Sequence, residues 1–157
     1  MTHPLSGKLE HIYVCAGVGR GTTLLTAFDQ ALRNAGVGDY NLLKVSSIVP
    51  PGARLVNNIG VPKGSLLPIA YGAISSTDEG EVISAAVSVA IPLDGNQVGV
   101  IMEFSGYTSE EKAREIVKRM AEEAMKNRNL QIKELIIKSA SARIEGPTSV
   151  FAGVALW

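Results

Sequence analysis

The chain has little of what several classes of protein require. Among its 157 residues there is one cysteine, and aromatic residues make up only 5%. A single cysteine, Cys15, cannot form an intramolecular disulfide, and the lack of a cysteine framework fits a reducing compartment. Cys15 lies in an apolar run, so we predict a buried, small hydrophobic residue. A disulfide-stabilised secreted scaffold is therefore excluded.

The chain also lacks any excess of charge and any long apolar segment. Fifteen basic and fifteen acidic residues cancel, so neither a nucleic-acid partner nor a charged tail is indicated. No apolar run approaches the ~20 residues of a membrane span, and the longest, Val82 to Leu93, is typical of a strand. His3, Pro4, Lys8 and Glu10 interrupt the region where a signal peptide would lie. We expect a cytoplasmic protein without membrane or nucleic-acid partners.

The hydrophobic content of 46% and the length predict one globular domain over residues 1–157. Thr22 or Thr23 can cap a helix that runs to about Ala35, with Leu24, Phe28, Ala31 and Ala35 on one face. A capping box at 108–111 begins a second helix, whose apolar stripe we interpret as core. Apolar and alternating stretches predict strands at 11–16, 40–45, 53–59, 66–75, 81–92, 97–105, 130–144 and 149–157. Two helices among many strands indicate a layered α+β domain.

A glycine-rich segment, Gly17 to Gly21, separates the first strand from the first helix and is predicted to be a loop. Its position resembles that of a phosphate-binding loop. However, Gly-x-Gly-x-Gly is not the dinucleotide fingerprint, no Gly-Lys-Ser/Thr follows, and repeated βαβ units are missing. We therefore favour a tight turn that lets the backbone approach another chain or a small ligand.

The most distinctive segment is Lys44 to Gly52, in which Ser46 and Ser47 precede Pro50, Pro51 and Gly52. Two prolines disfavour helix before them, so the backbone around Ser47 should be extended and held. A held Ser-Ser bond permits the Ser47 hydroxyl to attack the Ser46 carbonyl. Elimination and loss of ammonia would then leave a pyruvoyl group at position 47. By itself, the dipeptide is far more typical of an ordinary turn.

The surroundings resemble the pyruvoyl-dependent arginine decarboxylase family. The resemblance rests on the segments 24–32, 35–38, 41–42, 46–51 and 99–106, which occur in the family's order and spacing. It implies a four-layer αββα sandwich and cleavage into a β chain of 1–46 and an α chain of 47–157. It also implies decarboxylation of L-arginine to agmatine through a Schiff base on the pyruvoyl cofactor derived from Ser47. The family is trimeric, so a trimer or a dimer of trimers is expected.

Glu103 is the candidate general acid. The alternation of the strand 97–105 places it on one face with Gly99, Ile101 and Ser105, where partial desolvation would raise its pKa and favour the protonated form. A solvent-facing carboxylate or half of an ion pair is the structural alternative. The resemblance implies that Glu103 protonates the substrate carbon after carbon dioxide leaves.

Asp29 and Asn41 are the remaining candidates. Asp29 could pair with Arg33 on the helix surface, whereas the resemblance makes it the carboxylate that recognises the substrate guanidinium, with Ser46 also contacting substrate. Asn41 could simply open a strand, whereas the resemblance makes it catalytic at the scissile bond. An extended segment from 41 to 47 spans about 20 Å, so Asn41 would serve a neighbouring subunit's site.

Two alternatives stay open. The chain could be an uncleaved, non-enzymatic oligomeric binding protein on the same scaffold, or a decarboxylase of a different amino acid. No Cys/His cluster has metal-ligand spacing, so no metal site is expected. His3 and His11 are not expected to be catalytic.

Overall fold

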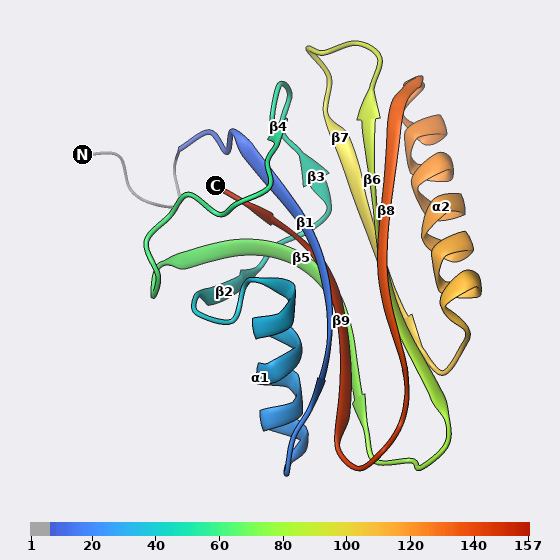
Figure 1. The fold of residues 1–157 in the computed structure, drawn as a ribbon. Helices are drawn as coiled ribbons and strands as arrows, with labels where there is room; N and C mark the ends of the chain where they lie inside the picture. Colours follow the sequence, from blue (N-terminus) through green and yellow to red (C-terminus); the bar gives the residue numbers. More distant parts are fainter. Residues whose placement is uncertain (1–6) are drawn as a thin grey trace.

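The computed structural model describes residues 7–157 as four stacked layers (Figure 1). Helix α1 (Leu24–Ala35) covers a five-stranded sheet, and helix α2 (Glu110–Asn127) covers a four-stranded sheet that packs on the first. The predicted αββα sandwich is therefore confirmed. His3 and Pro4 lie outside the described residues.

Across residues 7–157, nine strands form the two sheets. The strands are β1 (His11–Arg20), β2 (Asn41–Lys44), β3 (Ile48–Val49), β4 (Arg54–Leu55), β5 (Leu66–Ser76), β6 (Val82–Pro92), β7 (Gly99–Gly106), β8 (Ile132–Arg143) and β9 (Thr148–Leu156). The five-stranded sheet has the order β2-β5-β9-β1-β4, and the four-stranded sheet has the order β3-β7-β6-β8. The strand predicted at 53–59 is shorter in the structure, where Arg54 and Leu55 pair with β1.

The continuous apolar character of β6 and β9 follows from their positions. Both are interior strands of sheets whose two faces are covered, so no face needs polar residues. Buried side chains such as Val87, Ile101 and Val150 fill the layer between the sheets. Phe151 and Ile69 pack instead on the α1 side of the five-stranded sheet.

The helix starts lie at or next to the predicted caps. Thr23 caps α1 by accepting a hydrogen bond from the Thr26 amide. Ser109 caps α2 by accepting one from the Lys112 amide, so α2 begins one residue later than a capping box at 108–111 predicts. Gly36 ends α1 with a φ of 88°. The prediction that Leu24 lies on the buried face of α1 is wrong, because its side chain is 44% exposed. Within the described residues, no helix is long and apolar enough to cross a membrane.

The prediction of a glycine loop at 17–21 is wrong, because β1 continues to Arg20. A Cβ atom at Gly17 would lie 2.8 Å from the Ala35 nitrogen, and one at Gly19 would lie 2.8 Å from the Gln30 carbonyl carbon. The glycines therefore let the backbone of α1 lie directly on β1. The close approach is to the chain's own helix, not to a ligand.

Gly19→Ala should destabilise the domain. The added methyl group meets helix backbone, which cannot rotate away, and such overpacking costs about 1–3 kcal/mol. Urea unfolding measures the change, with Gly95→Ala as control because nothing lies within 4 Å of a Cβ there. Equal stability of the two variants would contradict the close packing.

Candidate active site at the crossing between the sheets

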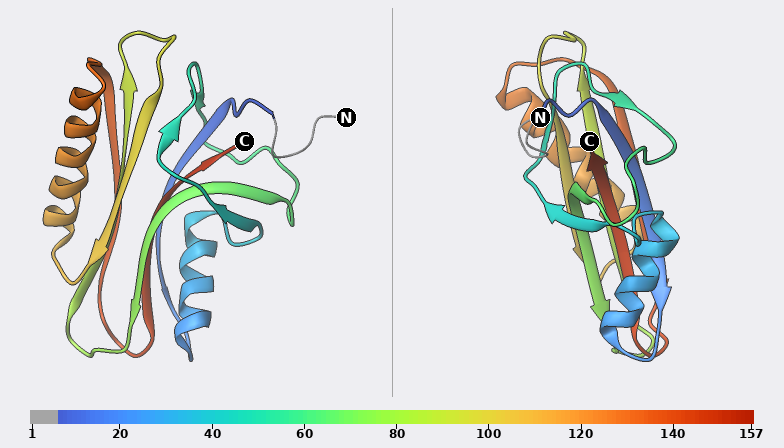
Figure 2. Two further views of the ribbon diagram at one scale, coloured as in Figure 1. Left: turned by 180° about the vertical axis from the view of Figure 1, so that it is seen from behind. Right: turned by 90° about the vertical axis from the view of Figure 1, so that its left-hand side faces the viewer.

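The Ser46–Ser47 bond lies where the chain crosses from one sheet to the other. β2 forms an edge of the five-stranded sheet beside β5, and β3 forms an edge of the four-stranded sheet beside β7. Residues 45–47 connect these two strands. In the left view of Figure 2 the chain passes from β2, near α1, to β3, beside the other sheet. The bond is therefore part of neither sheet.

Both flanks of this bond are anchored, each to a different sheet. The Val45 amide donates to the Ile69 carbonyl of β5 at 3.0 Å, and the Ile101 amide of β7 donates to the Ser47 carbonyl at 2.8 Å. The predicted holding of this segment is confirmed, although the chain bends at Ser47 and is not fully extended there. A bend is needed because the strands on either side belong to separate sheets. Cleavage would leave each new end bound to its own sheet.

The turn after the serines is also formed. The Ala53 amide donates to the Pro50 carbonyl at 3.1 Å, and Gly52 has a φ of 77°, which favours glycine. Ser46 is exposed, whereas Ser47 is half-buried against the edge of β7. The residue whose carbonyl would be attacked is therefore at the surface.

Glu103 lies on the strand that holds Ser47. Ile48 pairs with Val100, so continuing the register places Ser47 opposite Ile101, two residues before Glu103. In a strand, residues two apart share a face. Ile101 points into the layer between the sheets, and Glu103 therefore does the same, as the alternation predicts.

The carboxyl group of Glu103 is poorly solvated. Its Oε2 atom is buried and has no hydrogen-bond partner among the described residues. Burial raises the pKa of Glu103, and the positive charge of Lys44 partly opposes this effect. An unpartnered buried carboxyl oxygen is costly unless a proton or a ligand satisfies it. This side chain therefore has the environment of a proton donor.

The two sheets come together closely beside Glu103. A Cβ at Gly72 of β5 would lie 3.1 Å from the Phe104 carbonyl oxygen, and Ser105 Oγ donates to the Ala73 carbonyl at 3.0 Å. These contacts join β5 to β7, the strands that anchor the two flanks of the Ser46–Ser47 bond. The Ser46–Ser47 bond and Glu103 thus lie at the same side of the sandwich, where β5 meets β7.

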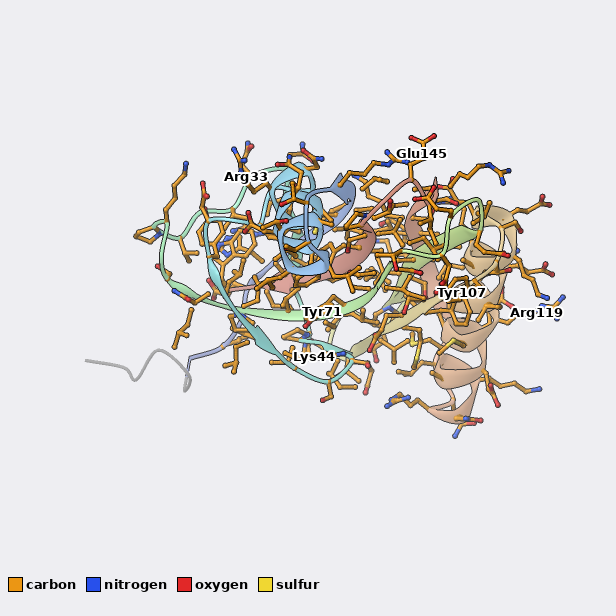
Figure 3. The ribbon with its side chains drawn as sticks, turned by 90° about the horizontal axis from the view of Figure 1, so that it is seen from below. Arg33, Lys44, Tyr71, Tyr107, Arg119 and Glu145 are labelled. Atoms are coloured by element: carbon orange, nitrogen blue, oxygen red, sulfur yellow. The ribbon has the colours of Figure 1, made fainter. Side chains whose placement is uncertain are left out.

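Lys44 is a site residue that the sequence reasoning missed. Its Nζ lies 4.7 Å from the centroid of the Tyr71 ring, an arrangement that favours a cation (Figure 3). It is also the charge that acts on Glu103. Its position three residues before Ser47 was the available signal, but the pairing with Tyr71 depends on the register of β2 with β5.

Asp29 and Asn41 are not brought to Ser47 within one chain. Asp29 is exposed on α1, which packs on the face of the five-stranded sheet away from Glu103. Asn41 begins β2, and its Nδ2 donates to the Gly64 carbonyl at 2.8 Å. It lies about 10 Å along the strand from Lys44, at 3.3 Å per residue. The described chain therefore assembles Ser46, Ser47 and Glu103 but not these two residues.

Comparisons with known proteins agree with this geometry. The sequence profile described as pyruvoyl-dependent arginine decarboxylase matches residues 11–152. A protein of that name from Methanocaldococcus jannaschii is 42% identical over 93% of this chain and 88% of its own length. Another, from Pyrococcus furiosus, is 38% identical over 90% of this chain and 91% of its own. The chain belongs to the pyruvoyl-dependent arginine decarboxylase family.

A solved structure of a pyruvoyl-dependent histidine decarboxylase is also similar in fold. Its TM-score is 0.50 at 15% identity, covering 64% of this chain and 54% of that chain. Membership of the pyruvoyl-dependent arginine decarboxylase family implies a pyruvoyl cofactor. The residues present fit such a group, because an anchored Ser47 lies beside the strand that carries the unpartnered carboxyl oxygen of Glu103.

Cys15 and His11 lie on β1, away from that edge. Burial raises the pKa of the Cys15 thiol to about 12, against smaller lowering effects of Lys138 and the Gly153 carbonyl. The predicted burial of Cys15 is confirmed, with 2% of its surface exposed. His11 stacks on Trp157 with ring centroids 5.5 Å apart. From residue 7 onward, no group of three or more His, Cys, Asp or Glu side chains could hold a metal ion.

Proposed function

We propose that this chain cleaves itself between Ser46 and Ser47, converts Ser47 into a pyruvoyl group, and decarboxylates L-arginine to agmatine and carbon dioxide. The observation that carries the proposal is the buried, unpartnered carboxyl oxygen of Glu103 on the same strand that binds the Ser47 carbonyl. Family membership supplies the expectation of arginine as substrate.

The cleavage uses the chain's own atoms and one water molecule. The Ser47 hydroxyl adds to the Ser46 carbonyl and the amide nitrogen leaves it, which converts the amide into an ester. Loss of the Ser47 α-proton then breaks the ester bond and releases Ser46 as a carboxylate. Water replaces the Ser47 nitrogen, which departs as ammonia. The anchors at Val45 and Ile101 hold the two ends throughout.

In decarboxylation, the pyruvoyl group supplies a ketone that binds the substrate amine and accepts the electron pair of the breaking carbon–carbon bond. Glu103 holds the proton that the substrate carbon needs once carbon dioxide has left. Its burial raises its pKa and so favours the protonated form, the state that a general acid requires.

The complete site requires a second copy of the chain. Since Asp29 and Asn41 are remote from Ser47 in one chain, we expect a neighbouring subunit to supply them, within a trimer or a dimer of trimers. Leu43 and Ile48 are 38% and 39% exposed on the edge strands that flank the scissile bond. Contact between copies at this edge would cover these side chains and bring the partner's polar groups to the site.

Intact-mass analysis and a denaturing gel test the proposal directly. Two chains that end at Ser46 and begin with a pyruvoyl group at position 47, together with carbon dioxide release from arginine, are expected. A single band near 16.6 kDa without activity would favour the uncleaved binding protein. Two chains with activity on ornithine or histidine but not on arginine would identify a different amino-acid substrate.

Asp29→Asn should weaken the preference for arginine while leaving cleavage intact. A charge-assisted hydrogen bond to a guanidinium contributes about 1.5–3 kcal/mol, or roughly ten- to a hundredfold in apparent affinity. Steady-state kinetics on arginine and citrulline measure the loss, because citrulline carries a neutral urea in place of the guanidinium. An unchanged preference would show that another group selects the substrate.

Lys44→Met should shift the pH dependence of decarboxylation. Removal of the positive charge that opposes burial raises the pKa of Glu103 further, so the protonated acid persists to higher pH. The fall in kcat/KM for arginine with rising pH should therefore occur at higher pH. Lys44→Arg keeps the charge and should retain the native profile. A shift to lower pH in Lys44→Met would contradict this assignment.

A further inference from the structure

The carbonyl of Ser47 is bound by a donor of the backbone, which anchors it to β7. The Ile101 amide donates to it at 2.8 Å. Ser47 follows the crossing segment and precedes β3, so this hydrogen bond extends the pairing of Ile48 with Val100 by one position. The bond therefore depends on strand register and not on any side chain.

This carbonyl survives the proposed conversion of Ser47. The nitrogen of Ser47 would be lost as ammonia, its Cβ would become the methyl group and its Cα the ketone carbon, but its carbonyl would stay in the amide with Ile48. It is then bonded directly to the ketone carbon that reacts with substrate. Of the polar atoms of Ser47, the carbonyl oxygen is the one that keeps its place in the chain.

A carbonyl in conjugation with the reacting carbon takes up part of the electron pair that decarboxylation releases. Hydrogen-bond donors fixed at a position where negative charge develops stabilise the transition state more than the ground state. The Ile101 N–H is such a donor, because β7 holds it between β3 and β6 and it needs no rearrangement.

We infer that the backbone N–H of Ile101 both positions residue 47 and stabilises charge on its carbonyl oxygen during decarboxylation. The inference rests on the proposed function and adds to it a second catalytic contribution from β7. Glu103 supplies the proton two residues farther along the same strand. One strand would therefore both stabilise the negative charge that develops and deliver the proton to the substrate carbon.

The test replaces the Ile101 amide by an ester, using the α-hydroxy analogue of isoleucine, which removes the N–H and keeps the side chain. The matched control is the same change at Met102. Successive N–H groups of a strand point in opposite directions, so the Met102 N–H faces β6, where Met102 pairs with Ser88. Each variant loses one ladder donor of β7, but only the Ile101 ester loses the donor to Ser47.

We expect kcat for arginine to fall about 10²- to 10³-fold in the Ile101 ester relative to the Met102 ester, with a smaller change in KM. Without substrate, phenylhydrazine should also react more slowly with the cofactor ketone of the Ile101 ester. Slower self-cleavage confined to the Ile101 ester would support the positioning role. Equal kcat, cleavage and phenylhydrazine rates in the two esters would overturn the inference. If the unmodified chain neither cleaved nor released carbon dioxide, the proposed function itself would fail.

Discussion

The Ser47→Ala variant should accumulate as one intact chain of 16.6 kDa and release no carbon dioxide from arginine. A methyl group cannot attack the Ser46 carbonyl, and without the ester the later elimination has no leaving group. Cleavage and activity are therefore lost together. An intact-mass measurement and a carbon dioxide assay on the same preparation test both.

The fold should be unaffected by this change. Ser47 is half-buried at a bend, and the hydrogen bond that holds it uses its carbonyl, which alanine keeps. Loss of one hydroxyl at such a position costs about a kcal/mol at most. Thermal unfolding of Ser47→Ala should therefore be close to that of an uncleaved wild-type precursor.

Ser46→Ala is the matched control for Ser47→Ala. It removes the neighbouring hydroxyl but keeps the carbonyl that is attacked and the hydroxyl that attacks it. We expect this variant to cleave. Cleaved Ser47→Ala protein would disprove self-processing by Ser47, and an uncleaved Ser46→Ala would show that the Ser46 hydroxyl is required as well.

The layered fold could be predicted from the sequence because its signals are local. Thr23 and Ser109 mark the helix starts, and the alternation along 97–105 correctly places Ile101 and Glu103 on one face. The apolar stretches at 81–92 and 149–157 predict strands where β6 and β9 lie. None of these inferences needs to know which strands are neighbours.

The errors and omissions arose where the answer depends on tertiary contacts. Gly17 and Gly19 look like a loop in the sequence. In the fold they belong to β1 and are required because the backbone of α1 packs directly on them, a contact that the local pattern does not reveal. Lys44 gains its role through Tyr71 and Glu103, on two other strands. The anchoring of Ser47 by Ile101 requires the register of β3 with β7, which periodicity cannot supply.

Glu103→Gln should allow most self-cleavage but slow decarboxylation about 10²–10⁴-fold, the usual cost of losing a general acid. The amide keeps the shape of the side chain and fills the same space between the sheets. It can donate a hydrogen bond but cannot transfer a proton to the substrate carbon. The loss should therefore appear in kcat, with a smaller effect on KM.

The pH profile separates proton donation from a packing effect. Because burial raises the pKa of Glu103, the native rate should be highest where the carboxyl group is protonated and should fall as the pH rises through that value. The residual rate of Glu103→Gln should lack this fall, since the amide does not titrate in that range. Burial of Glu103 also affects stability, because its ionised form is less stable in the folded chain than in the unfolded chain. The contribution of this group to the free energy of unfolding is therefore lost as the pH rises through its raised pKa.

Glu134→Gln provides the control, because Glu134 is an exposed carboxylate on β8, at the opposite edge of the same sheet. Stopped assays at several pH values, on protein shown by mass to be fully cleaved, give kcat for both variants. We expect Glu134→Gln to keep the native rate and profile. If fully cleaved Glu103→Gln turned over arginine at the native rate, the proton would have to come from another group. The unpartnered oxygen between the sheets would then need a different explanation.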